Sequence, residues 1–412
     1  MDRSAALDVI LLLCLLAAVL SAATPVPQRI GYLLATGTYA VVLAISFVRG
    51  RLAVRFDRVV LVPVVALWAV FLVEYWLHPD GTTLRTGTYI VFSALNLFVV
   101  PATFPREAFI DALAVVSAVV AGIALPLVWF DVMYNGGLLG VWHSSKYLDS
   151  VLTNPNKLSA LSAFGFVAMF GVARSRRRKW VAVVGGGCCL VGLAVSQGRA
   201  AALGVVGAVV LLGVYRLFGT RAVVGVTVIG IAGAAVLFRL ALGPIGGIEA
   251  TRSVGEAFNT RGGLWSAAIR AILDRPALGY GLVDDGPILA AHGGPTPAGN
   301  VYSVHNSYLR MFLMTGVIGG VLYLLVCLAA LVRSLEAMAR STALDTAHVF
   351  LPLLGVVLVI ELFGNSPIFG LSFVSVYGAL VFGYSQQGKR LPLRAERVTT
   401  WISERTRDEE TG

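Results

Sequence analysis

Apolar stretches long enough to cross a lipid bilayer recur through most of this 412-residue chain. A transmembrane helix needs roughly 17–25 predominantly apolar residues. Only 13% of the residues are charged, about half the share found in soluble domains, which excludes a soluble fold. The sequence therefore predicts an all-α integral membrane protein with about twelve transmembrane helices. These spans are expected near 7–23, 30–48, 59–77, 87–103, 108–130, 158–173, 180–196, 200–217, 222–238, 307–332, 347–363 and 367–385.

The distribution of Lys and Arg predicts how the chain is oriented in the membrane. Short cytoplasmic loops are enriched in basic residues, and basic clusters lie here at 49–58, 174–179 and 389–407. We therefore expect a multi-pass protein of the cytoplasmic membrane with both termini in the cytoplasm. The net charge of +10 has the same explanation. We interpret RSRRRK at 174–179 as a topology anchor and expect no nucleic-acid partner.

The predicted spans and loops divide the chain into four parts. These are transmembrane helices in 1–238, an extracytoplasmic loop at 239–306, three more transmembrane helices in 307–385 and a cytoplasmic tail at 386–412. A cleaved secretory signal is an alternative for the first helix, because Arg3 and an apolar stretch precede SAA at 21–23. The many spans that follow favour an uncleaved helix.

Two loops on the predicted outer side, 131–157 and 239–306, are too long to be simple connectors. Loops beyond about 12–15 residues are usually functional or disordered. In the second loop, apolar residues recur at helical spacing and predict an amphipathic helix near 261–274 that ends before Pro276. We therefore expect an active site at the outer membrane surface. The sequence contains no metal-binding spacing, P-loop or dinucleotide fingerprint, so we expect neither a metal nor a cofactor.

Two arginines on the outer side stand where a cation is locally unfavourable. Arg199 lies between two apolar helices with almost no loop, where it must extend toward the interface or pair with an anion. Arg261 opens the loop helix, where a positive charge opposes the helix dipole. A snorkelling arginine and an exposed surface arginine are the simpler interpretations of each alone. Together they suggest a shared anionic ligand, because Arg grips phosphate in a bidentate manner.

Further polar residues flank the same loops. His305 and Asn306 lie where the large loop returns to the membrane, and Arg310 follows Asn306 by one helical turn. A lone interfacial histidine is often structural, but one beside phosphate could accept a proton near neutral pH. Lys157 opens a helix after an Asn-Pro turn. We interpret the acidic pair at 284–285 as a solvated turn.

Four motifs in a fixed order carry a family resemblance. They are NPNKL at 154–158, SQGRAAALG at 196–204, TRGGLWSAAIRAILDRPALGYG at 260–281 and VHNSYLRMFLMTGVIGG at 304–320. This order, with the many spans around it, resembles the O-antigen ligase and polymerase superfamily of bacterial membrane glycosyltransferases. The resemblance covers roughly 150–325.

The resemblance implies a donor glycan on a polyprenyl diphosphate and a glycan or lipid-glycan acceptor, joined outside the cytoplasmic membrane without a metal. Arg199 and Arg261 match the family's diphosphate-binding arginines, and His305 matches the histidine that activates the acceptor hydroxyl. We expect Asn306, Arg310 and Lys157 to contact substrate. A single displacement would invert the anomeric centre.

Two other functions stay open on the sequence. A polymerase would use a second lipid-linked glycan as acceptor, whereas a ligase would use a different acceptor. A transporter or flippase of lipid-linked sugars would need polar residues along a path through the membrane, for which Asn96, Glu74 and Glu361 are the candidates.

Overall fold

The structure of the protein is a computed structural model, which describes nine stretches of the chain. They are 3–77, 83–134, 143–144, 147–148, 151–173, 178–241, 259–294, 303–340 and 347–386. The predicted cytoplasmic tail lies outside the described residues, except for its first residue, and so do parts of both long outer loops.

The described residues are almost entirely helical, and eight segments are long and apolar enough to cross a membrane. They indicate a multi-pass membrane protein. These segments are α1 (Arg3–Ser21), α2 (Gln28–Val48), α3 (Arg58–Leu77), α4 (Thr83–Ala94) continuing through η1 (Leu95–Val99) into α5 (Val100–Thr103), α6 (Arg106–Tyr134), α8 (Lys179–Ser196), α9 (Arg199–Ala241) and α13 (Ser307–Arg340).

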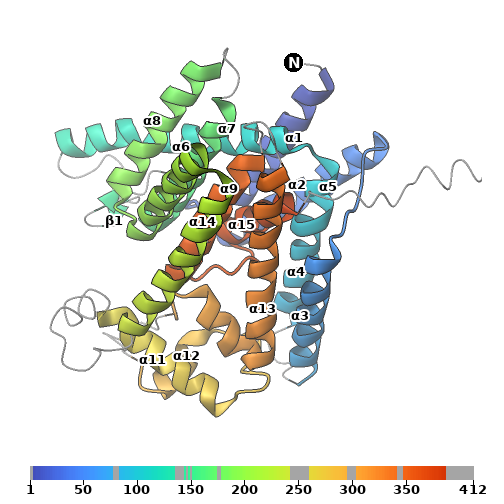
Figure 1. Ribbon diagram of the computed structural model, residues 1–412, viewed down its shortest axis with the longest axis vertical. Coiled ribbons are helices and arrows are strands. Elements are labelled where there is room, and N and C mark those ends of the chain that lie inside the picture. Colours follow the sequence, from blue (N-terminus) through green and yellow to red (C-terminus); the bar gives the residue numbers. More distant parts are fainter. Residues whose placement is uncertain are drawn as a thin grey trace, which may run out of the picture.

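Shorter helices complete the bundle. They are α7 (Pro155–Val172), α14 (Ala347–Phe363) and α15 (Phe373–Ser385), with α11 (Asn259–Asp274) and α12 (Asp285–Ala291) in the large loop. In Figure 1, α11 and α12 gather at one end of the molecule, below α13. Two strands that the sequence did not predict, β1 (His143–Ser144) and β2 (Tyr147–Leu148), form an antiparallel pair in the first long loop. Among the described residues, eight helices are thus long and apolar enough to span a membrane, and the total of twelve spans stays a prediction.

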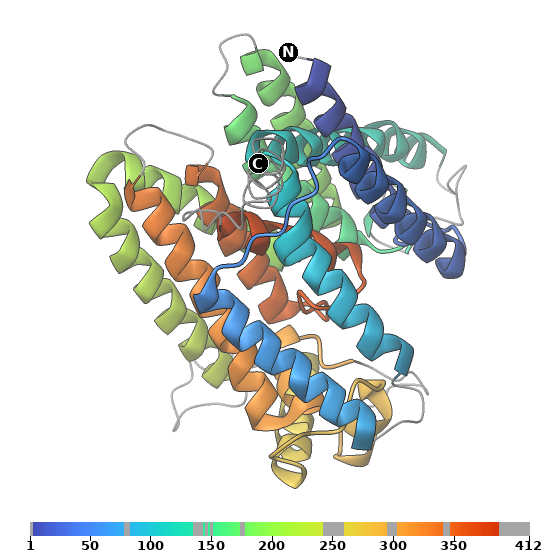
Figure 2. The ribbon, with the colours of Figure 1, turned by 90° about the vertical axis from the view of Figure 1, so that its right-hand side faces the viewer.

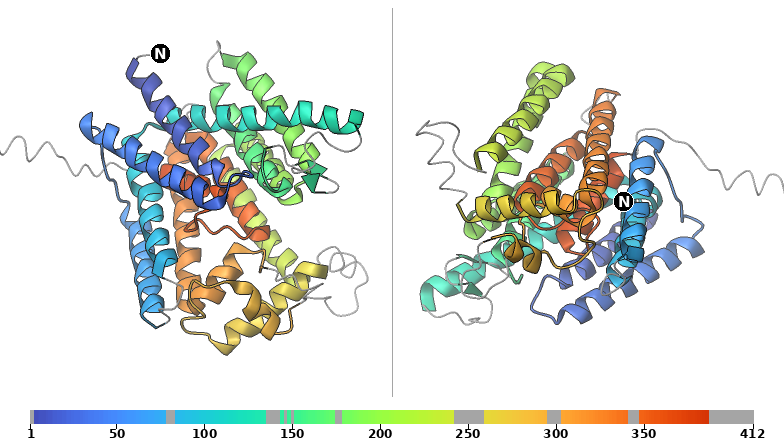
Figure 3. Two further views of the ribbon diagram at one scale, coloured as in Figure 1. Left: turned by 180° about the vertical axis from the view of Figure 1, so that it is seen from behind. Right: turned by 90° about the horizontal axis from the view of Figure 1, so that it is seen from below.

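Helix α9 covers two predicted spans and reverses direction between them. At Gly219 the backbone has φ 74° and ψ −173°, a conformation outside the helical region that is essentially restricted to glycine. Arg199 at the start of α9 is near Arg261, and Phe238 near its end stacks on Trp265 at 5.2 Å. Both ends of α9 therefore meet α11, and the chain doubles back at Gly219 as the right-hand view of Figure 3 shows.

Ion pairs connect segments that the charge pattern assigns to the same side of the membrane. On the predicted inner side, Arg333 near the end of α13 pairs with Asp57 before α3 at 2.7 Å, and Asp8 of α1 pairs with Arg49 at 2.9 Å. On the predicted outer side, Arg85 of α4 pairs with Asp284 at 2.8 Å. Helix α3 packs along α13 between these two ends (Figure 2).

A break in α13 anchors the large loop to the bundle. Gly316 has φ 63° and ψ −168°, which leaves backbone groups of α13 without their helical partners. The segment after α11 fills this break, because Val317 N donates to Pro276 O at 2.7 Å and Gly281 N donates to Met314 O at 2.8 Å. Backbone groups inside a membrane protein must find such partners. The break therefore fixes where α11 lies relative to α13.

Candidate functional site

The junction between α8 and α9 places Arg199 at the first residue of α9, where its side chain is exposed. Helix α8 ends at Gln197, which has a left-handed backbone with φ 51°. Gly198 follows, and a Cβ atom there would lie 2.1 Å from Ser159 Oγ of α7. Because Gly198 has no side chain, the junction between α8 and α9 packs closely against α7, near Lys157 at the start of that helix.

Helix α11 holds Arg261 at its first turn, as the sequence predicted, with an apolar face against the bundle. Trp265, one turn further along, is buried and lies between Phe238 and Phe363, with ring centroids 5.2 Å and 6.4 Å away. The Arg261 guanidinium is half-buried and lies over the Phe363 ring at 5.7 Å. A cation over an aromatic face is held in a defined position, so Arg261 is not a freely moving surface side chain.

The structure brings Arg199 and Arg261 together, although they are more than 60 residues apart in sequence. Burial lowers the pKa of the Arg261 guanidinium, and the neighbouring charge of Arg199 lowers it further. Arginine stays charged even so. Within the described part of the chain, neither guanidinium has a carboxylate partner. Two adjacent, uncompensated guanidinium groups provide a place for an anion.

His305 lies in a tight turn that leads into α13. Its backbone is left-handed with φ 50°, and among the described residues only Gln197 shares this conformation without being glycine. Such a conformation is uncommon outside glycine, Asn, Asp and His, and strained residues concentrate at functional sites. Both strained residues belong to motifs predicted from the sequence, one beside Arg199 and one at the expected base.

Burial and the neighbouring positive charges favour the neutral form of the His305 imidazole. Burial lowers the pKa of His305 below its usual value of 6.5, and the positive charge of Arg261 lowers it further. Arg310 acts in the same direction, whereas the Asp285 carboxylate opposes both. A neutral imidazole has a ring nitrogen that can accept a proton, so this environment suits a general base.

The other three predicted site residues make contacts within the protein. Asn306 is buried, and its Oδ1 accepts a hydrogen bond from Leu309 N at 3.0 Å, which caps α13. Arg310 donates to Asn365 O at 3.1 Å and lies 3.8 Å from Asp285. Lys157 donates to Thr153 Oγ1 at 2.8 Å. These contacts give each residue a structural task, and substrate contact by any of them remains a proposal.

Asp285 belongs to this cluster, and the interpretation of the acidic pair as a solvated turn is wrong for it. Asp284 is exposed, but Asp285 is 5% exposed and accepts hydrogen bonds from Ser303 Oγ at 2.6 Å and Val304 N at 2.9 Å. Tandem aspartates after a glycine-rich turn look equivalent in sequence. Only the arrangement of α12 against the His305 turn distinguishes them.

Two of the three polar residues proposed for a transporter path, Asn96 and Glu361, make hydrogen bonds inside the bundle. Asn96 accepts a hydrogen bond from the Tyr39 hydroxyl, and Glu361 accepts one from the Tyr323 hydroxyl at 2.7 Å. All four side chains are buried within the bundle. They therefore contribute to helix association.

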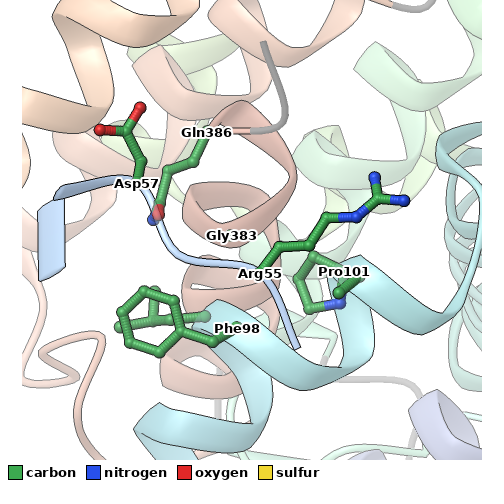
Figure 4. Close-up of a pocket in the computed structure, with 8 residues that line it drawn as sticks. Arg55, Asp57, Phe98, Pro101, Gly383 and Gln386 are labelled. Carbon is green, nitrogen blue, oxygen red and sulfur yellow. The ribbon is translucent and has the colours of Figure 1, made fainter. Parts of the chain in front are cut away.

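A small cavity lies at the opposite end of the bundle from His305. Figure 4 shows it between the segment before α3 and helices α5 and α15, with Asp57, Phe98 and Gln386 on its wall. It offers about 20 Å³, room for roughly one water molecule. Asp57 pairs with the far end of α13 from the His305 turn, so this cavity is separate from the candidate site. Across the described residues, no group of three metal-ligating side chains is found.

Part of the chain is similar to a known protein family. Residues 184–324 match the family model described as O-antigen ligase. The matched region contains Arg199, Arg261 and His305, together with Asp285 and the break in α13, and leaves out α1 to α7. The match covers about a third of the chain and makes this region similar to O-antigen ligases. No curated protein sequence matches the chain significantly.

Proposed function

We propose that this protein transfers a glycan from a polyprenyl diphosphate to an acceptor hydroxyl outside the cytoplasmic membrane, as the match of residues 184–324 to the O-antigen ligase family model suggests. The observation that carries the proposal is the convergence of Arg199 and Arg261 beside His305, which has a lowered pKa. Under this proposal the α11 end of the molecule faces the extracytoplasmic side and both termini lie in the cytoplasm.

The two arginines bind the diphosphate of the donor. They compensate its negative charge in the bound state, and they stabilise the charge that grows on the leaving oxygen as the sugar departs. Arg261, held over Phe363, fixes the orientation of the phosphates, while the exposed Arg199 closes on them from α9. Lys157 contributes further positive charge, and Asn306 and Arg310 contact the substrate from the start of α13.

His305 removes the proton of the acceptor hydroxyl. The acceptor oxygen attacks the anomeric carbon, a new glycosidic bond forms there, and the bond from that carbon to the diphosphate oxygen breaks. The proton passes to the His305 ring nitrogen, and the bond electrons leave with the polyprenyl diphosphate. One displacement inverts the anomeric centre. Because the diphosphate is already a good leaving group, positioning and charge stabilisation supply most of the catalysis.

A direct assay tests the proposal. Purified protein in liposomes is given a labelled polyprenyl-diphosphate oligosaccharide and an envelope extract from a strain that lacks the gene as the source of acceptor. Appearance of label on an acceptor, together with released polyprenyl diphosphate, is the expected result. Movement of intact donor across the bilayer without cleavage would instead identify a transporter of lipid-linked sugars and reject the enzyme.

Ligase and polymerase make different predictions for the cell surface. Mass analysis of the surface glycan after deletion of the gene separates them. An acceptor that carries no glycan identifies a ligase, whereas an acceptor that carries a single short repeat identifies a polymerase. Restoration by wild-type protein, and not by His305→Ala, is the matched control.

A further inference from the structure

Both polar backbone groups of Val304, the residue before His305, are held by hydrogen bonds. Val304 N donates to Asp285 Oδ2 at 2.9 Å, and Val304 O accepts from Trp265 Nε1 at 3.0 Å. Ser303 Oγ donates to the same Asp285 oxygen at 2.6 Å. On the other side of His305, Asn306 caps α13. The left-handed backbone of His305 is thus fixed by contacts at the residues before and after it.

We propose that Asp285 is a positioning residue that holds His305 in its left-handed turn and sets its charge for proton transfer. This inference rests on the proposed glycosyl transfer and assigns a task to a residue that the arginine and histidine motifs do not include. Asp285 acts on His305 through the backbone of 303–304 and through its own negative charge. It does not itself contact substrate.

The geometry requires a carboxylate at 285 for two reasons. One oxygen accepts two hydrogen bonds from the His305 turn, while the other lies 3.8 Å from Arg310 Nη2. Both charged side chains are largely buried, with 7% and 13% of the side chain exposed. Removing one partner of a buried pair leaves the other uncompensated. Asp285 therefore also offsets the positive charge of Arg310 close to the imidazole.

Among the described residues, the charged groups that face His305 come from three elements: Arg261 from α11, Asp285 from α12 and Arg310 from α13. Asp285 is the one negative charge among these three. Loss of its charge leaves two positive neighbours, which disfavour the imidazolium. The pKa of His305 is then expected to fall further below 6.5.

The experiment compares Asp285→Asn and Asp285→Ala with Asp284→Asn. Asp284 is the matched control, because it is adjacent in sequence but exposed and paired with Arg85. The first readout is the rate at which diethyl pyrocarbonate modifies His305 as a function of pH, followed by mass spectrometry. This reagent attacks the neutral imidazole, so the midpoint reports the His305 pKa whether or not the protein transfers glycan.

The second readout is glycan transfer by the same liposomes. We expect Asp285→Asn to lower the modification midpoint and Asp284→Asn to leave it unchanged. Asp285→Ala is expected to lower kcat about 10²-fold through misplacement of the base, with the KM for donor within about threefold, as for a group that binds no donor. Asp285→Asn, which keeps one oxygen acceptor, is expected to retain more kcat than the alanine variant.

Three outcomes separate the claims. An unchanged midpoint in Asp285→Asn overturns the electrostatic role, and wild-type kcat in folded Asp285→Ala overturns the positioning role. If Asp285→Ala does not fold, Asp285→Asn tests both roles: an unchanged kcat overturns the positioning role, and an unchanged pH midpoint of His305 modification overturns the electrostatic role. A shifted midpoint in a protein that transfers no glycan rejects the proposed function and supports the coupling between Asp285 and His305.

Discussion

Trp265 donates its indole N–H to the carbonyl oxygen of Val304 across 3.0 Å, and so connects α11 to the turn that carries His305. Arg261 lies one helical turn before Trp265 on the same helix. The residue proposed to bind the donor and the residue proposed to act on the acceptor are therefore positioned through one buried side chain. A movement of α11 would change both positions together.

Replacement of His305 tests its role as base. His305→Ala is expected to lower transfer by about 10²–10⁴-fold, the usual contribution of general base catalysis. Binding of a short-chain polyprenyl diphosphate should persist, because the two arginines remain. Transfer rate and diphosphate affinity measured on the same purified variant provide the check. Wild-type transfer rates in His305→Ala would remove this residue from the mechanism.

The pH dependence of kcat/KM follows from the lowered pKa of His305. Only the unprotonated imidazole accepts a proton, so activity falls as the pH drops through the pKa of the free enzyme. Burial and Arg261 keep this pKa below 6.5, and the acid limb is expected below that value. Arg261→Gln removes a positive neighbour and should move the limb to higher pH. A limb above pH 6.5 in the wild type, or one that does not move in Arg261→Gln, would contradict the assignment.

The pair of arginines should behave as one anion site. Arg199→Ala and Arg261→Ala are each expected to weaken binding of a short-chain polyprenyl diphosphate, and the double variant less than additively, since the two groups share a ligand. Thermal stabilisation of the protein by the diphosphate measures this binding. Arg340→Ala, which removes an exposed arginine from the far end of α13, is the control. If the diphosphate stabilised the wild type and both single variants equally, the proposal that these arginines bind it would be rejected.

Much of the fold could be predicted from local sequence. Apolar length alone locates α1, α2, α3, α6 and α13, and the two separate spans predicted at 200–217 and 222–238 correspond to the two halves of α9. The helix near 261–274 follows from 3.6-residue periodicity. The first long loop was harder, because α6 continues to Tyr134 and a strand pair follows.

The site was only partly accessible from sequence. Arg199, Arg261 and His305 could be proposed from the sequence, because the placement of the two arginines is locally unfavourable and all three residues match motifs of the family that the chain resembles. Asp285 was missed because its burial depends on α12 packing against a turn 18 residues further along the chain. The docking of 276–281 into the break of α13 was also missed. Backbone hydrogen bonds between distant segments leave no trace in residue type except glycine, here Gly279 and Gly316.

Close packing at Gly198 should be necessary for the position of Arg199. Gly198→Ala places a Cβ atom 2.1 Å from Ser159 Oγ and 2.2 Å from Ser159 Cβ, so α7 or the start of α9 must move. We expect weaker diphosphate binding and slower transfer, with recovery in the double variant Gly198→Ala/Ser159→Gly. Gly207→Ala in α9 is the control, because a Cβ there has nothing within 4 Å. Failure of Ser159→Gly to restore activity would show that the defect has another cause.

The break in α13 can be tested by comparing two glycines with almost the same backbone. Gly219 has φ 74° and ψ −173°, and Gly316 has φ 63° and ψ −168°. Alanine at either position costs about 1–3 kcal/mol of conformational strain. A Cβ at Gly219 meets nothing within 4 Å, whereas one at Gly316 lies 2.2 Å from Ala277 O. Gly316→Ala is therefore expected to lower the apparent Tm in detergent more than Gly219→Ala does, and to displace the 276–281 segment that positions α11. It should also reduce glycan transfer at temperatures where the protein is still folded, since Arg261 lies on α11. Equal loss of stability in the two variants would mean that docking of this segment contributes little.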